Sequence, residues 1–319
     1  MRNYIMGRVL LAIPALIAIT IIIFLAMRIV PGDVLAVMFG EEGTLHMTAE
    51  DRARITADLG LDKAIYLQYA DWIKDILTLE LGHSFWRADS VMDLIRHRGP
   101  LTAEIGILSV ILSWMIGLPV GIISAMMRNK MPDYVSRIFT ITFLAIPNFW
   151  LGSMIVLVLL LSFEWKAPLG VINIWDNPWQ NLQIVWGPVL VLGVGQAALI
   201  ARLARSTLLE VIHEDYVRTA RAKGLAERVV IMRHALRNAI LPVVTLSGVL
   251  LGFLLGGSVA VEQAFGVPGL GRTLVAAFEE RDYMVIQNLV LLYGVAFVAV
   301  NLLIDISYAF IDPRIRYSN

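Results

Sequence analysis

The sequence predicts an all-α integral membrane protein with six transmembrane helices, and two observations carry this prediction. First, 58% of the 319 residues are apolar and only 16% are charged, whereas about 25% of the residues of an average soluble domain are charged. Second, six apolar stretches without a charged residue are close to or above the ~20 residues that a helix needs to cross about 30 Å of hydrocarbon. These stretches are Val9–Met27, Ile105–Met127, Ile138–Phe163, Leu182–Ala201, Ala239–Val261 and Tyr283–Ile304.

The overall charge and the cysteine content exclude several classes of protein. The formal net charge is +0 and the chain contains no cysteine. A protein that binds nucleic acid needs a net basic face, so the neutral balance argues against nucleic acid as a partner. Without cysteine there is no disulfide, no thiolate nucleophile and no cysteine metal site.

The first span, within residues 1–30, is expected to remain in the protein as a membrane anchor. Arg2 and Arg8 precede its apolar core, as basic residues do in a secretory signal peptide. The core is longer than the ~7–15 residues of a signal peptide, and no A-x-A cleavage site follows it.

The segment 31–100 is expected to form a small helical insert between the first and second spans. Its signals of helix ends are a capping box at Thr48 and Asp51, a C-terminal Gly60, a cap at Asp62 for a helix to about Leu77, and a cap at Ser90 with Asp93. The helix after Asp62 would carry an apolar stripe of Tyr69, Trp72, Ile73 and Ile76. Such helices either shield the outer ends of the spans or dock a partner, and the sequence leaves both roles open.

Lysine and arginine predict the orientation in the membrane, because cationic side chains near span ends resist translocation. One set of short loops contains only Lys166, Arg272 and Arg281. The opposite set includes both termini, which are therefore expected in the cytoplasm, and it leaves the segment 31–100 external. Its basic residues are Arg2, Arg8, Arg128, Lys130, Arg137, Arg202, Arg205, Arg218, Arg221, Lys223, Arg228, Arg233, Arg237, Arg314 and Arg316.

The predicted cytoplasmic loop 201–240 carries helix signals on either side of a glycine. Asp215 can cap a short helix that extends to Lys223, and Gly224 then allows a left-handed turn. A second helix, Ala226–Asn238, leads into the fifth span, where Pro242 follows. On the first helix, three residues share one face: Tyr216, Ala220 and Lys223. From charge alone, positive-inside orientation and ordinary helix punctuation explain this pattern.

The order of residues in the loop is more specific than its charge. Arg218-Thr219-Ala220 is followed by Gly224 and then by Ile240-Leu241-Pro242. This order resembles the signature of the permease subunits of binding-protein-dependent ABC importers, which is Glu-Ala-Ala, three residues, Gly and a hydrophobic-Leu-Pro element. The chain departs from Glu-Ala-Ala and has a longer Gly-to-Pro separation than the general signature. In both respects it resembles the dipeptide, oligopeptide and nickel branch of that family.

The resemblance extends over almost the whole chain. Further similar segments are Arg28–Asp33, Leu59–Asp62, Gln68-Tyr69, Ile146–Trp150, Val267–Arg272, Arg281–Tyr283, Asn301–Asp305 and Asp312–Tyr317. Ala64 and Met284 stand where the family commonly has proline, and the segment Trp165–Gln183 is less similar. These departures leave the exact solute open.

The resemblance implies a type I ABC importer permease fold in the inner membrane. Residues 101–312 would be the permease core, which includes the coupling loop 201–240, and residues 313–319 would be a cytoplasmic tail. The implied partners are a paralogous permease subunit, two ATPase subunits that use ATP and Mg, and an external solute-binding protein that delivers peptides or a related small solute. The residues implied to dock in an ATPase subunit are Asp215, Tyr216, Arg218, Thr219, Ala220, Arg221, Ala222, Lys223 and Gly224.

No residue of this chain is expected to be catalytic or to bind a metal or cofactor. No lysine is preceded by glycine as in a phosphate-binding loop, and no histidine lies within a predicted span. The Gly269-x-Gly271 pair lacks the third glycine of a dinucleotide fingerprint and is expected to form a loop turn near the external mouth.

Polar groups at membrane depth are costly, so each is a candidate for a role in the pathway or in contacts between helices. The candidates are Asn148, Gln196, Asn288, Asn301 and Asp305. Hydrogen bonds between helices are favoured for the amides, and an ion pair with Arg314 or Arg316 for Asp305. The alternative function is an ion-gradient-driven secondary transporter, which would need ionisable groups near the membrane midplane, and the predicted spans carry none there.

Overall fold

The computed structural model describes residues 2–29, 48, 50–51, 56, 62–86 and 89–311. In order along the chain, the elements are α1 (Arg2–Ile29), α4 (Ile65–Thr78), α5 (Val91–Met126), α6 (Met131–Ala145), α7 (Asn148–Phe163), α8 (Pro178–Val211), α9 (Asp215–Ala222), α10 (Glu227–Val229), the π-helical η1 (Val230–Ala235), α11 (Leu236–Phe265), α12 (Leu270–Glu280) and α13 (Tyr283–Ile311). The described chain is therefore built from helices, as predicted.

Five helices of the described chain are long and apolar enough to cross a membrane, and the bent pair α6 and α7 gives a sixth span if it is counted as one. The third predicted span, Ile138–Phe163, is divided in the structure, because α6 and α7 are bent by 95° relative to each other. Pro147 has no N–H to continue the hydrogen-bond ladder, and the residue before a proline is driven to extended backbone. Ile146 has φ −84° and ψ 123°, so the break lies at this pair.

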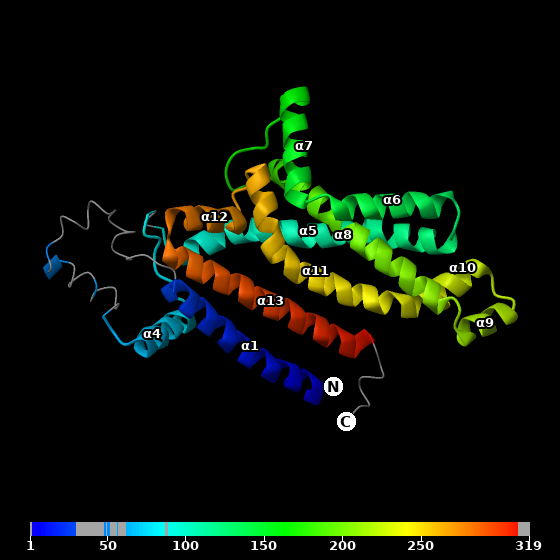
Figure 1. The fold of residues 1–319 in the computed structure, drawn as a ribbon, viewed down its shortest axis with the longest axis horizontal. Coiled ribbons are helices and arrows are strands. Elements are labelled where there is room, and N and C mark those ends of the chain that lie inside the picture. Colours follow the sequence, from blue (N-terminus) through cyan, green and yellow to red (C-terminus); the bar gives the residue numbers. More distant parts are fainter. Residues whose placement is uncertain are drawn as a thin grey trace.

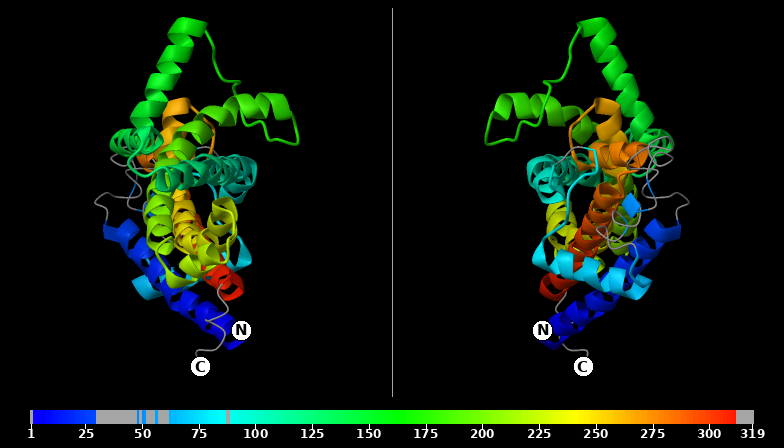
Figure 2. Two further views of the ribbon diagram at one scale, coloured as in Figure 1. Left: turned by 90° about the vertical axis from the view of Figure 1, so that its right-hand side faces the viewer. Right: turned by 90° about the vertical axis from the view of Figure 1, so that its left-hand side faces the viewer.

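The long helices run alongside one another, and α7 projects from one side of them at a steep angle (Figure 1). Helices α9 and α10 lie at one end of this bundle, and α4 and α12 lie at the other. Helix α1 begins and α13 ends toward the end that carries α9. In the views of Figure 2, α7 and the start of α8 extend away from the rest of the bundle.

Helices α5 and α8 pack closely because small residues line their contact. A Cβ on Gly117 would lie 2.6 Å from the carbonyl oxygen of Ala197, and a Cβ on Gly121 would lie 2.6 Å from that of Ala201. Small residues four apart allow two membrane helices to approach to backbone contact. These glycines therefore fix how near α8 lies to α5.

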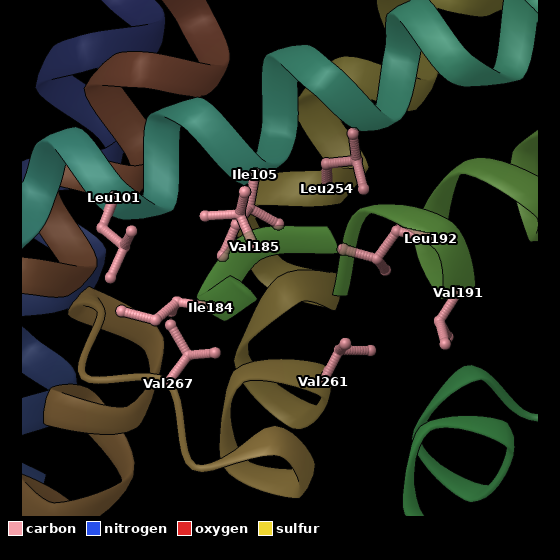
Figure 3. Close-up of a cluster of buried hydrophobic side chains, with 9 residues drawn as sticks. All are labelled: Leu101, Ile105, Ile184, Val185, Val191, Leu192, Leu254, Val261 and Val267. Carbon is pink, nitrogen blue, oxygen red and sulfur yellow. The ribbon is translucent and has the colours of Figure 1, made fainter. Parts of the chain in front are cut away.

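The largest buried apolar cluster lies where α5, α8 and α11 cross (Figure 3). Its members are Leu101, Ile105, Ile184, Val185, Val191, Leu192, Leu254, Val261 and Val267. Val267 comes from the turn between α11 and α12, so the cluster extends to the end of the bundle that carries α12.

Helix α4 packs against α1 through aromatic rings. The ring centroids of Phe24 and Tyr69 are 5.3 Å apart, and those of Phe24 and Trp72 are 5.9 Å apart. The predicted apolar stripe is confirmed, since Tyr69, Trp72, Ile73 and Ile76 are all partly buried. This contact holds α4 against α1.

The predicted helix caps of the segment 31–100 have mixed outcomes. The N–H of Asp51 donates to Oγ1 of Thr48 over 3.1 Å, which confirms that cap. Asp62 does not cap α4, because the helix begins at Ile65 and Ala64 occupies the N-cap. Ser90 is the N-cap of α5, but its side chain makes no capping bond. Gly60 lies outside the described residues.

Candidate functional site

The short helix that the loop sequence predicted is α9. It begins after Glu214, which occupies the N-cap with extended backbone, so the prediction that Asp215 caps the helix was wrong. Asp215 lies in the first turn, where a carboxylate is stabilised by the positive end of the helix dipole. Its backbone oxygen accepts a hydrogen bond from Oγ1 of Thr219 over 2.9 Å. Arg218 Nη1 lies 3.4 Å from its carboxylate.

The turn after α9 depends on glycine. Lys223 is the C-cap, and Gly224 has φ +76°, a backbone conformation that L side chains rarely adopt. The N–H of Gly224 donates to the carbonyl oxygen of Arg221 over 2.9 Å. No described atom lies within 4 Å of where a Cβ on Gly224 would be. Glycine is therefore favoured by the backbone angle, while the space beside it is open.

One face of α9 is buried against the chain's own helices. Val217 and Ala220 belong to a cluster with residues of α5, α8, η1 and α11. Tyr216 and Lys223, which share a helical face with Ala220 in the sequence pattern, are exposed. The small side chain of Ala220 thus allows α9 to approach η1 and α11, and the exposed residues Asp215, Tyr216, Arg218, Thr219, Ala222, Lys223 and Gly224 remain open to a partner.

Arg221 closes the loop between α9 and α10. Its Nε and Nη2 donate to the two carboxylate oxygens of Glu227 over 3.0 and 2.7 Å, and its Nη1 donates to the carbonyl oxygen of Ile212 over 3.2 Å. The hydrogen bond to Glu227 raises the pKa of the Arg221 guanidinium. A bidentate pair of this kind fixes direction as well as distance. Arg221 therefore holds α9 to its own chain.

Tyr216 ties α9 to α11. Nδ2 of Asn238 donates to the hydroxyl of Tyr216 over 2.8 Å. The predicted helix Ala226–Asn238 is divided into α10, η1 and the first turn of α11, and α11 continues through Pro242 into the span. The i→i+5 bonds of a π-helical segment are rare and often occur at functional positions.

A buried carboxylate joins the ends of α5, α6 and α8 near α9. Asp133 on α6 is fully buried. Arg205 on α8 donates to both of its oxygens, over 2.8 and 3.1 Å, and Arg137 Nη2 lies 2.8 Å from Oδ2. Ser124 on α5 donates from Oγ over 2.6 Å. The sequence analysis missed Asp133, and the signal was an acidic residue within a loop otherwise rich in arginine.

The polar candidates of the spans lie in different surroundings. Nδ2 of Asn288 donates to the carbonyl oxygen of Leu81, over 3.0 Å, and so joins α13 to the segment before α5. Nδ2 of Asn301 donates a hydrogen bond to the carbonyl oxygen of Phe297, which is also on α13. Asp305 forms an ion pair with Arg8 over 3.2 Å, which joins α13 to α1. The predicted partners Arg314 and Arg316 lie outside the described residues.

Asn148 and Gln196 are the two candidates that the structure brings together. Both line a concavity of about 520 Å³ at the junction of α6 and α7. Gln196 is buried and Asn148 is exposed. The remaining three candidates do not line this concavity.

Glu262 is a second buried carboxylate that the sequence analysis did not select. It is the residue after the predicted fifth span, it is fully buried, and its Oε2 accepts from the N–H groups of Gly271 and Arg272 over 2.8 and 3.2 Å. The Gly269-x-Gly271 pair, predicted as a loop turn, instead forms the N-cap and first turn of α12, and it was the available signal, because a Cβ on Gly271 would lie 2.8 Å from the same oxygen. Glu262 thus positions the start of α12 at the end of the bundle opposite α9.

A metal site is not found in the part of the chain that the structure describes. There, no group of three or more His, Asp or Glu residues is close enough to hold a metal ion. The candidate site is therefore a helix with one buried and one exposed face at the end of a membrane bundle.

Comparisons with known proteins define the class to which this helical membrane bundle belongs. Residues 117–317 match the model described as binding-protein-dependent transport system inner membrane component. Residues 1–106 match the model of the N-terminal part of such membrane components. The chain belongs to the family of binding-protein-dependent transport system inner membrane components, and it is a permease subunit of an ABC importer.

Two curated relatives align over nearly the full chain. The glutathione transport system permease protein GsiC of Salmonella choleraesuis (strain SC-B67) is 38% identical over 317 residues, covering 99% of this chain and 100% of its own length. The putative peptide transport system permease protein BAB2_1050 of Brucella abortus (strain 2308) is 36% identical over 317 residues with the same coverage. These relatives give no support to the alternative of an ion-gradient-driven transporter.

A solved structure shares the fold. A chain of the MetNI methionine ABC transporter, in an inward-facing conformation, superimposes with a TM-score of 0.55 at 23% sequence identity. The match covers 69% of this chain and 97% of that one. The predicted type I ABC importer permease fold is confirmed.

Proposed function

We propose that this permease moves short peptides or a related small solute such as glutathione, and that α9 is the element through which ATPase subunits drive it. The names of the two curated relatives support the solute class. The proposed assembly contains a paralogous permease subunit, two ATPase subunits and an external solute-binding protein. ATP and Mg act on the ATPase subunits, and this chain is a non-catalytic membrane subunit.

The attachment of α9 to two spans is the observation that carries the coupling role. Its buried face packs on η1 and α11, its Arg221 is bonded to Ile212 and Glu227, and its Tyr216 accepts from Asn238. A helix held at several points moves as a rigid unit. A displacement applied to its exposed face is therefore passed to α8 on one side and to α11 on the other.

The exposed face of α9 suits a polar cleft in a partner. Arg218 and Lys223 are exposed and can donate to acidic side chains or backbone carbonyls. Thr219 and Ala222 are also exposed and are short enough to let another chain approach. These residues, with Asp215, Tyr216 and Gly224, form the proposed docking surface, while Ala220 and Arg221 support it from within.

The end of the bundle that carries α9 also indicates how the chain is oriented in the membrane. Helix α9, the N-terminal end of α1 and the C-terminal end of α13 lie toward one end of the bundle, with the basic loops that the positive-inside rule assigns to the cytoplasm. We therefore propose that both termini are cytoplasmic in an inner-membrane protein. Residues 1–30 are then the anchor, 31–100 the external segment, 101–312 the permease core and 313–319 the tail.

Site-directed cross-linking tests the docking surface. Because this chain has no cysteine, Thr219→Cys is its single thiol, and it can be labelled with benzophenone maleimide and irradiated in a complex assembled with cysteine-free partner subunits. We expect a covalent adduct with an ATPase subunit. The matched control is Gly170→Cys, an exposed position in the loop between α7 and α8, which is expected to give no such adduct. An adduct with ATPase from Gly170→Cys alone would reject the assignment of α9.

A further inference from the structure

The break between α6 and α7 creates a concavity within the membrane-spanning part of the fold. Residues of α6, α7, α8 and α11 line its volume of about 520 Å³. Its walls are mostly apolar and include Phe143, Leu144, Leu250 and Phe253. Two amide side chains, Asn148 from the start of α7 and Gln196 from α8, are set among them.

Gln196 carries a buried acceptor without a partner. The residue is 8% exposed, and its Oε1 has no hydrogen-bond partner among the described residues. A buried polar atom left in this condition has lost its hydrogen bond to water without gaining one in the protein. Gln196 lines the concavity, and its enclosed Oε1 meets a donor there once the side-chain amide turns toward the open space.

Asn148 owes its place to a neighbouring glycine. A Cβ on Gly195 would lie 2.7 Å from Oδ1 of Asn148, so the missing side chain of Gly195 makes room for this amide beside α8. Asn148 is exposed and forms the first residue of α7, immediately after the Pro147 break. The break that bends the span thus exposes the amide of Asn148. This amide lies beside Gly195 of α8, the residue that precedes Gln196 in the chain.

Lipid hydrocarbon does not satisfy the side-chain amides of Asn148 and Gln196. Hydrocarbon offers no hydrogen-bond partner, and polar groups within spans therefore face protein or a water-filled cavity. The partly exposed ion pair of α1 and α13 differs, because Arg8 lies near the helix end and can reach water. Asn148 instead lies at the start of α7 and Gln196 lies within α8, each inside a span predicted from its apolar sequence.

We propose that Asn148 and Gln196 contact the solute as it passes, and that they recognise the backbone of an amide-bearing solute. This inference rests on the proposed function and specifies its solute contact. Oε1 of Gln196 accepts an N–H of the solute, while the amide of Asn148 can both accept and donate. The apolar walls, including Phe143 and Phe253, contact its aliphatic parts without fixing the sequence of side chains.

Uptake kinetics in proteoliposomes that contain the whole complex test this proposal. The probes are radiolabelled glutathione and radiolabelled Ala-Ala. Gln196→Met keeps the side-chain length but removes the acceptor, and we expect uptake to fall at least tenfold for the transported probe. The ATPase activity that the loaded binding protein stimulates should stay within twofold. Asn301→Leu is the matched control, since that amide bonds within α13, and its uptake should stay within twofold.

Cysteine labelling distinguishes a contact with the solute from a purely structural role of these amides. Asn148→Cys should react with a membrane-impermeant methanethiosulfonate in the nucleotide-free complex and should be protected by the probe. Leu11→Cys, exposed on α1, should react at least tenfold more slowly. Unchanged uptake by Gln196→Met, or equal slow labelling at both positions, would overturn the proposal. Loss of the second permease on purification of Gln196→Met would instead assign the amide to the subunit interface and overturn it too.

The two proposals fail in different ways. If α9 is not the docking element, substitutions on its exposed face leave the stimulated ATPase activity unchanged. Gln196→Met can still lose uptake in that case. If the solute contact is wrong, Gln196→Met retains both stimulated ATPase activity and uptake.

Discussion

Helix α9 and the adjacent ends of α5 and α8 are neighbours, but different interactions hold them. Between α5 and α8, glycines bring the two backbones into contact, and the buried Asp133 joins α5, α6 and α8. Helix α9 buries only Val217 and Ala220, and its ion pair with α10 is largely exposed. The bundle end is therefore stabilised by buried contacts, whereas α9 is oriented mainly by surface bonds.

This difference separates stability from coupling. A change inside the bundle end should unfold the protein or move the spans, because close-packed contacts cannot relax freely. A change on the exposed face of α9 should leave the fold intact and alter only what α9 touches.

The largest expected loss of stability is that of Asp133→Ala. The substitution leaves Arg205 and Arg137 without their shared carboxylate, and breaking a buried pair from one side costs about 3 kcal/mol or more. Unfolding in mixed micelles by titration with dodecyl sulfate measures the change in free energy. The more exposed pair of Arg221 and Glu227 provides the matched control. Glu227→Gln should cost less than about 1 kcal/mol. Equal losses for the two variants would remove the distinction between the two regions.

A smaller loss is expected for Gly121→Ala at the α5–α8 contact. The new Cβ would lie 2.6 Å from the carbonyl oxygen of Ala201 and 2.8 Å from Cβ of Ala204. Overpacking of this kind costs about 1–3 kcal/mol. The control is Gly106→Ala on the same helix, where no described atom lies within 4 Å of the added Cβ. That substitution should be neutral or stabilise the helix by up to about 1 kcal/mol, so a loss at position 106 equal to that at 121 would contradict the packing account.

The fold was largely predictable because apolar length is a direct physical requirement of the bilayer. The span Ile138–Phe163 was the exception, since its composition is uniformly apolar although Pro147 divides it into two helices. Composition reports whether a segment prefers hydrocarbon, and it does not report the direction of the backbone. The proline was visible, but a proline within a membrane helix is often tolerated, as Pro119 in α5 and Pro188 in α8 are here.

The candidate site was predictable in position but only partly in geometry. Helix α9 and its terminal Gly224 lie where the loop sequence indicated. The burial of Ala220 and the bonds of Arg221 and Tyr216 depend on η1 and α11, which approach α9 only in the folded chain. For the same reason Asp305 pairs with Arg8, about 300 residues away in sequence, which local spacing cannot reveal.

The most direct test of coupling through α9 is ATP-driven uptake by Gly224→Trp in proteoliposomes with all partner subunits. Gly170→Trp is the matched control, since Gly170 also has a positive φ, +96°, and open space beside it, but lies between α7 and α8. The account predicts that Gly224→Trp inserts normally and loses uptake, while Gly170→Trp retains it. Normal uptake by the Gly224→Trp protein would contradict the account.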